Sequence, residues 1–164
     1  MKLKRVLTSP EKATSDLLAI CYSYESKTCP TSLKSLDKNL GGKISQFIKD
    51  GLISHKKDTI FRITPLDKSN FKHVLFIGTG KTKKITAPDL RHMSGTLSRV
   101  TKKLRCKSLS LVIDSKSIGD VTAEKVSQSI AEGLGMGSYF FQGLKSKKNT
   151  DTILQEVTLV SDLK

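Results

Sequence analysis

The chain has 164 residues and is strongly basic, with 29 Lys and Arg against 15 Asp and Glu and a formal net charge of +14. Its length suits a single domain with one core, and 37% hydrophobic and 27% charged residues are typical of a globular protein. No apolar run approaches the roughly 20 residues of a membrane span, and polar residues 8–11 stand where a signal peptide would be apolar. We therefore expect a cytoplasmic protein without a membrane partner.

The cysteines and histidines form no metal or redox motif. The chain has three cysteines, Cys21, Cys29 and Cys106, so they cannot all pair with one another. None belongs to a C-x-x-C motif, which excludes zinc-ribbon and thioredoxin-type sites. Free thiols in a reducing compartment explain them. The three histidines are far apart and make no H-x-x-x-H or H-E-x-x-H pattern. We expect no metal and no cofactor in this chain.

The first half of the chain predicts two strands, a helix and two further strands. Residues 2–7 form an expected edge strand, and the apolar residues 16–22 a buried strand. From residue 33 to the stop at Gly51, apolar residues at three- and four-residue steps predict a helix, in which Gly41 and Gly42 mark a break or a close contact. Residues 59–64 and 71–77 predict antiparallel neighbouring strands joined by a short turn.

The second half of the chain alternates helices with strands. Thr86, Pro88 and Asp89 predict a helix start, and apolar residues follow at helical spacing. A strand is expected at 108–113, a helix capped by Asp120 or Thr122 after it, and a last strand at 153–160. The inner faces of the two helices would be Leu90, Met93, Leu97, Val100 and Leu104, and then Val126, Ile130, Leu134, Gly137, Phe141 and Leu144.

This order of elements predicts an α/β fold. Helices between strands must cover the faces of a sheet, so we expect three layers with a mixed β-sheet flanked by helices. No sequence period of 20–50 residues repeats, which excludes a solenoid.

The glycine-rich segments do not fit nucleotide-binding loops. In Gly78-Thr79-Gly80-Lys81-Thr82, the first glycine of a P-loop would fall on Leu75, inside the strand. The third glycine of a dinucleotide fingerprint would fall on Lys83. We expect a tight turn that ends the strand.

A second glycine-rich segment lies inside the last predicted helix. Gly133, Gly135 and Gly137 alternate there, and amides bonded within a helix cannot cradle an anion. We interpret these glycines as sites of close helix–sheet packing. No G-x-S-x-G motif and no paired carboxylates occur, so the chain alone is not expected to be an enzyme.

Several short sequences, in their order and spacing, resemble the N-terminal domain of the leucyl (cytosol) aminopeptidase family. They cover the chain from Lys2 to about Val160. The two longest matches are an apolar strand that ends in a Gly-x-Gly-Lys turn, and a pattern of Glu-Gly, Tyr-x-Phe and Lys near the end of the domain. The segments are Thr8-Ser9-Pro10-Glu11-Lys12, Leu36-Asp37-Lys38, Ile44-Ser45, Gly51, Val74-Leu75-Phe76-Ile77-Gly78-Thr79-Gly80-Lys81, Ala131-Glu132-Gly133-Leu134, Ser138-Tyr139-Phe140-Phe141 and Leu144-Lys145-Ser146.

The resemblance implies a macro-domain-like fold in which residues 1–164 are a single non-catalytic domain. In that family a C-terminal catalytic domain, absent here, holds two divalent metals, zinc or manganese, and removes N-terminal residues from peptides. Its signature Asn-Thr-Asp-Ala-Glu-Gly-Arg-Leu does not occur in this chain. Family enzymes are hexamers, and some bacterial members bind DNA. The implied role of this domain is assembly, stability or substrate access.

An alternative function is nucleic-acid binding through the basic residues 81–107, which carry one acid, Asp89. Few aromatic residues are available for base stacking, and a solvated surface explains the same charge. A third alternative, an ADP-ribose-binding macro domain, rests on the shared fold alone. The nine basic residues are Lys81, Lys83, Lys84, Arg91, Arg99, Lys102, Lys103, Arg105 and Lys107, of which the last five are the predicted phosphate contacts.

Overall fold

The computed structural model describes residues 1–25, 27–65, 69–81, 84–114, 118, 121–139 and 154–161. Within these ranges the strands form one sheet in the order β1-β6-β5-β2-β4-β3. The β3–β4 pair is antiparallel and the other neighbours are parallel, so the sheet is mixed, as predicted. The strands are β1 (Lys2–Val6), β2 (Leu17–Tyr22), β3 (Ile60–Ile63), β4 (His73–Gly78), β5 (Ser108–Ile113) and β6 (Glu156–Ser161).

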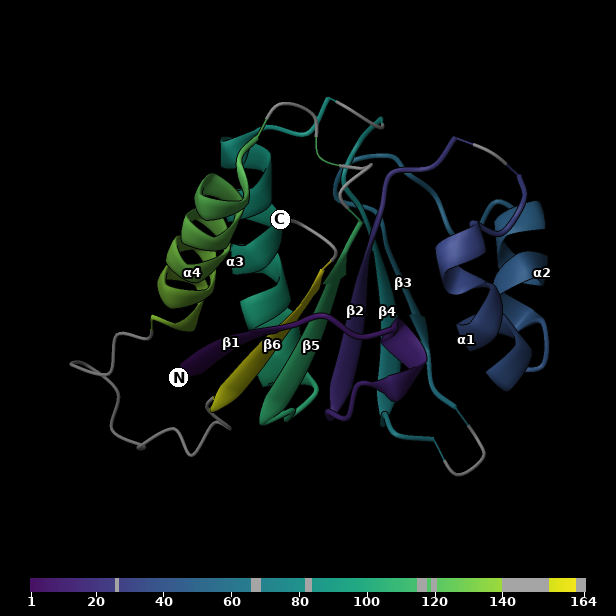
Figure 1. The fold of residues 1–164 in the computed structure, drawn as a ribbon, viewed down its shortest axis with the longest axis horizontal. Helices are drawn as coiled ribbons and strands as arrows, with labels where there is room; N and C mark the ends of the chain where they lie inside the picture. Colours follow the sequence, from purple (N-terminus) through teal and green to yellow (C-terminus); the bar gives the residue numbers. More distant parts are fainter. Residues whose placement is uncertain are drawn as a thin grey trace.

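Helices cover both faces of the sheet. Figure 1 shows α3 and α4 on one side and α1 and α2 on the other, which confirms the three-layer prediction. The described helices are α1 (Lys34–Asn39), α2 (Lys43–Lys49), α3 (Ala87–Lys103) and α4 (Ala123–Ser138), with the 3-10 turns η1 (Pro10–Lys12) and η2 (Thr31–Leu33).

One of the two central strands of the sheet is β2, whose six residues are all buried. Leu17, Ala19 and Cys21 belong to the core under α3 and α4, whereas Leu18 and Ile20 belong to the core under α1 and α2. A strand covered on both faces is apolar throughout, which is why this run lacks a polar alternation.

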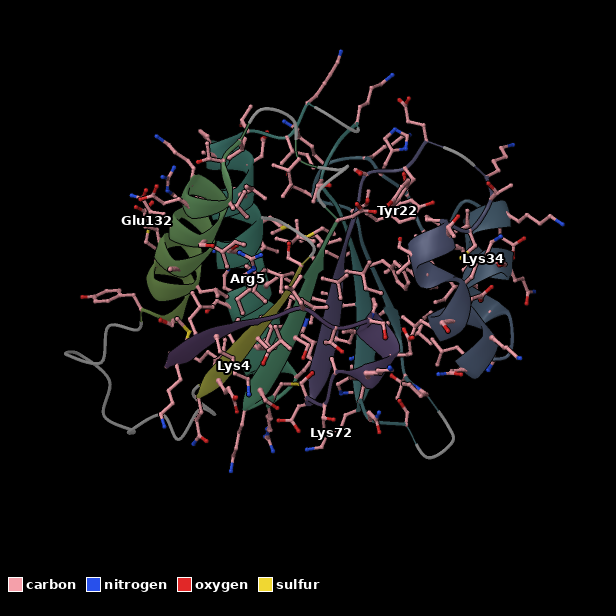
Figure 2. All side chains as sticks on the ribbon, in the orientation of Figure 1. Lys4, Arg5, Tyr22, Lys34, Lys72 and Glu132 are labelled. Atoms are coloured by element: carbon pink, nitrogen blue, oxygen red, sulfur yellow. The ribbon has the colours of Figure 1, made fainter. Side chains whose placement is uncertain are left out.

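Asp16, directly before β2, joins the beginnings of three strands. Its Oδ2 accepts the backbone N–H groups of Lys107 (2.7 Å) and Ser108 (3.2 Å), next to β5. Its Oδ1 lies 2.7 Å from Lys72 Nζ, and its carbonyl accepts the N–H of His73 at the start of β4. Figure 2 shows Lys72 at this end of the central strands and Tyr22 at the other.

Residues 33–51 form two helices rather than one. Gly41 and Gly42 have positive φ angles of 64° and 76°. Such angles are incompatible with a continuing helix and favour glycine, so the break is confirmed and the continuous helix is wrong. Asp37 stabilises the junction, since its Oδ1 accepts the N–H of Ser45 (3.1 Å) and its Oδ2 the Ser45 hydroxyl.

The predicted helix starts are confirmed at α3 and α4. Thr86 and Asp89 form a capping box, in which the Thr86 N–H donates to Asp89 Oδ2 (3.0 Å). Thr122 accepts from the Lys125 N–H and caps α4. The inner faces are buried as predicted at Leu90, Met93, Leu97, Val126, Ile130 and Leu134, with Val100 and Leu104 partly buried; Asp120, Phe141 and Leu144 lie outside the described residues.

Gly133 and Gly137 of α4 face helix α3 and not the sheet, so the prediction of close helix–sheet packing at these glycines is wrong. A Cβ at Gly133 would lie 2.2 Å from the Arg91 carbonyl oxygen, and one at Gly137 would lie 2.5 Å from the Gly95 carbonyl oxygen. A Cβ at Gly135 would meet nothing within 4 Å. Two of the three glycines therefore let the helix backbones approach closely.

Gly133→Ala should destabilise the fold, because its methyl group would collide with the backbone of α3. We expect a loss of about 1–3 kcal/mol in the free energy of unfolding, measured by urea denaturation. Gly135→Ala is the matched control in the same helix and should be neutral or stabilise by up to about 1 kcal/mol. Equal effects of the two substitutions would contradict this packing.

Lowering the pH should reduce the stability of the fold, because the Asp16 carboxylate becomes protonated. Burial raises the pKa of its carboxyl, but hydrogen bonds from Lys72, Lys107 and Ser108 outweigh burial and lower the pKa from 3.8. A carboxyl with a lowered folded pKa contributes stability that is complete above its unfolded pKa and is lost as the pH falls through the folded pKa.

Asp16→Asn should therefore cost about 1–3 kcal/mol of unfolding free energy at pH 7, because charged hydrogen bonds are replaced by weaker ones. The difference between wild type and variant should shrink as the pH falls below 3.8. Urea denaturation at pH 7 and pH 3 measures it, with the exposed Asp50→Asn as control. A difference that does not change with pH would contradict the proposed role of the carboxylate.

Candidate functional site

Five predicted phosphate contacts gather at the C-terminal end of α3. Arg99, Lys102 and Lys103 lie in its last turns, and Arg105 and Lys107 lie between the helix and β5. Lys102 is partly buried and the other four are exposed. Leu97, on the opposite side of the helix, is fully buried, so the charged side chains point away from the core as predicted.

The charges at this end of α3 face solvent. Among the described residues no ion pair involves Arg99, Lys103, Arg105 or Lys107. The Arg99 guanidinium donates to Thr96 Oγ1 at 2.9 Å, within its own helix. We name Arg99, Lys102, Lys103, Arg105 and Lys107 the basic end of α3.

The other basic residues of the 81–107 segment lie elsewhere. Lys81 is paired with Glu25 (2.8 Å), next to the turn that follows β4. Arg91 is paired with Glu132 (2.6 Å) across the α3–α4 contact, on the outer side of the molecule in Figure 2. Lys83 lies outside the described residues. The described basic residues of the run are therefore spread from the turn after β4 to the C-terminal end of α3.

The turn at residues 78–80 uses its backbone N–H groups within the protein. The N–H of Gly78 donates to the Thr59 carbonyl (2.8 Å), that of Thr79 to Tyr22 (3.1 Å) and that of Gly80 to His55 (2.7 Å). A Cβ at Gly78 would lie 2.0 Å from the Lys56 carbonyl oxygen, so only glycine fits below the 54–59 loop. Because these donors are occupied, the turn ends a strand and is not a phosphate loop, as predicted.

No activated nucleophile is found among the described cysteines. All three are free thiols, and burial raises the pKa of Cys21 to about 12. Burial also raises the pKa of Cys29 and of Cys106. A thiol with a raised pKa is mostly protonated near neutral pH and reacts slowly.

The part of the chain that the structure describes contains no group of three or more His, Cys, Asp and Glu side chains placed to hold a metal ion. Those residues therefore do not fit the metal pair that the resemblance implies for a catalytic domain. In the same part of the chain, no helix combines the length and apolar character of a membrane span.

A cavity of about 470 Å³ was not predicted from the sequence. It lies between η1, the α1–α2 junction, the end of β3 and the residues before β4. The lining comes from three regions of the sequence (Glu11, residues 36–43 and residues 63–71), and each contributes only a few residues, so no local pattern pointed to the cavity. Its charged lining residues are Glu11 and Lys43.

Comparisons with known proteins agree with this architecture. Residues 20–148 match the family described as "Cytosol aminopeptidase family, N-terminal domain". Among solved structures the chain is similar to a tomato leucine aminopeptidase mutant, with 18% identity and a TM-score of 0.77. The match covers 98% of this chain and 32% of that enzyme, so this chain spans about a third of its length.

Macrodomains share the fold, which confirms the macro-domain-like prediction. The macrodomain of Thermus aquaticus DarG has 14% identity and a TM-score of 0.62, over 97% of both chains. A Trypanosoma brucei macrodomain solved in complex with ADP-ribose has 7% identity and a TM-score of 0.69, over 97% of this chain and 63% of that one. Identities this low establish the architecture only.

Proposed function

Because the chain belongs to the cytosol aminopeptidase family, as its N-terminal domain, we propose that it is the non-catalytic part of a metal-dependent leucyl aminopeptidase. Its partner is then a C-terminal catalytic domain, which holds two divalent metals, zinc or manganese, and removes N-terminal residues from peptides. The domain, residues 1–164, serves assembly into a hexamer, stability or substrate access in the cytoplasm. The observation that carries this proposal is the family match over residues 20–148.

The internal structure of the chain supports this role. Two separate apolar cores lie on the two faces of one sheet, so the described residues have hydrophobic cores of their own. A unit with its own cores can fold as an appended domain and leave catalysis to another part of the polypeptide.

The 164-residue chain should not hydrolyse leucine anilides, with or without added manganese or zinc, because two-metal hydrolysis requires ligands that the described residues do not gather. The control is the full polypeptide encoded by the same gene, which should contain the family's signature peptide and turn over the anilide. Metal-dependent turnover by the purified 164-residue chain would overturn the proposal. A gene that encodes no catalytic domain after Lys164 would overturn it as well.

The basic end of α3 favours a second function, binding of nucleic acid. Arg99, Lys103, Arg105 and Lys107 are exposed, and no ion pair among the described residues involves them. Contacts of such side chains with phosphates are largely independent of base sequence. Binding should therefore weaken with rising salt, with a logarithmic slope of about 0.9 for each phosphate neutralised.

Changing Lys102 and Lys103 to Glu should weaken duplex DNA binding at near-physiological salt and reduce the salt slope, measured by titration of a labelled duplex. The control is the same charge change at Lys34 and Lys38, exposed residues of α1 on the other side of the sheet. Binding that is undetectable at this salt, or that is equally affected by both double variants, leaves the basic end of α3 as a solvated surface.

A further inference from the structure

The strand β1 forms one edge of the sheet and is exposed along its whole length. In the order of the described strands it has β6 as its neighbour on one side and no strand on the other. All five of its residues are exposed, and Figure 2 shows Lys4 and Arg5 on this strand. An open strand edge presents a row of backbone N–H and C=O groups, with which a further strand can pair.

The register of β1 with β6 identifies the backbone groups that point to the open edge. The N–H of Lys2 donates to the Gln155 carbonyl oxygen (2.7 Å), so the main-chain groups of Lys2 face β6. The main-chain groups of successive residues in a strand point to opposite edges. The N–H and C=O groups of Leu3 and Arg5 therefore point to the open edge, where the structure describes no strand.

The side chains along this edge include a cluster of exposed apolar groups. Eight large hydrophobic side chains are exposed among the described residues, and four of them lie in residues 1–7. Such a concentration in one short segment is typical of a surface that contacts another molecule. The four are Met1, Leu3, Val6 and Leu7.

The same edge is positively charged. The strand contains Lys2, Lys4 and Arg5 and no acidic residue. Lys4 is paired with Glu156, whereas no ion pair among the described residues involves Lys2 or Arg5. These charges attract an acidic partner and repel a second copy of the same strand.

The open backbone groups distinguish a peptide from other acidic partners. Phosphates of nucleic acids or lipids accept hydrogen bonds but do not donate them, so they do not pair with the outward carbonyl groups of Leu3 and Arg5. An added peptide strand pairs with both the N–H and the C=O groups of an edge.

We propose that the open edge of β1 binds an extended acidic segment of another protein, which adds to the sheet as a further strand. Its main-chain groups pair with those of Leu3 and Arg5, its carboxylates contact Lys2 and Arg5, and its apolar side chains cover Leu3 and Val6. Since side chains alternate between the faces of a strand, each face of β1 carries both a cation and an apolar residue. The edge is formed by this chain alone, so the proposal does not rest on the proposed catalytic domain.

Isothermal titration of the 164-residue chain with three blocked peptides at near-physiological salt tests the proposal. The probe is Glu-Glu-Val-Val-Glu-Glu-Val-Val, which carries acidic and apolar side chains on each face of an extended strand. Glu-Glu-Pro-Val-Glu-Glu-Pro-Val has the same charge but lacks two backbone donors, so it should bind at least about 10-fold more weakly. The peptide with Lys in place of Glu should not bind. Equal affinity for the first two peptides, or no binding of the probe up to about 1 mM, would overturn the proposal.

Variants of β1 locate the binding. Leu3→Pro removes an outward N–H and keeps the bonds with β6, and it should weaken probe binding at least about 10-fold. Arg5→Glu reverses a charge and should have an effect of the same size. The control is Lys38→Glu, the same change of charge at an exposed residue of α1, which should leave binding unchanged. Thermal unfolding checks that each variant is folded, and probe binding that is unchanged in a folded Leu3→Pro or Arg5→Glu variant would contradict the assignment.

Three further measurements distinguish other occupants of this edge. A dimer in sedimentation that Arg5→Glu dissociates would assign the edge to a second copy of the chain. Displacement of the probe by duplex DNA or by anionic lipid vesicles would assign it to phosphates. Loss of probe binding in the full polypeptide encoded by the gene would show that another part of that polypeptide covers β1. Each of these results would overturn the proposal.

Discussion

The complete burial of β2 is the constraint on which the rest of the structure depends. A parallel strand hydrogen-bonded on both edges and covered on both faces requires a partner strand on each side and a helical layer on each face. Its neighbours β4 and β5 and the helical pairs α3–α4 and α1–α2 meet these requirements. Asp16 joins the beginnings of these strands, since its carboxylate accepts N–H groups next to β5 and its backbone carbonyl accepts the N–H of His73 in β4.

Local patterns in the sequence predicted most elements of this fold. The apolar run at 16–22, the antiparallel pair at 59–77 and the helix start at Thr86 each depend on neighbours in the sequence, and each was found. The break at Gly41 and Gly42 was an open alternative, because apolar spacing continues across two short helices as it does along one. The predicted packing partner of Gly133 and Gly137, the sheet, was wrong. The spacing of residues along a helix identifies which of them share a face, but it does not identify the element that packs against that face.

The candidate sites were harder to predict for the same reason. The charges of residues 81–107 looked like one cluster, yet a 17-residue helix separates its two ends in space. The cavity beside Glu11 is built from four segments whose proximity depends on the tertiary fold. Only the exposed face of α3 at Arg99 and Lys103 followed directly from helical spacing.

The carboxyl edge of the sheet is closely packed at the turn after β4. The turn after β4 occupies its three N–H groups with carbonyls of Thr59, Tyr22 and His55. The 54–59 loop packs directly on Gly78, so this part of the carboxyl edge of the sheet serves the packing of the protein itself. A cavity of about 470 Å³ lies at the opposite edge, beside α1.

The pairing of β1 with β6 has a consequence for folding during synthesis. Lys2 lies beside Glu156, so β1 has no sheet partner until β6, about 150 residues later in the chain, has been synthesised. Its exposed apolar residues, Leu3 and Val6, meanwhile remain available to other chains. Three basic residues in the five-residue strand repel a second copy of the same strand, which reduces aggregation of the nascent chain. The charge of β1 therefore opposes pairing with a second copy at the stage when this strand has no partner within its own chain.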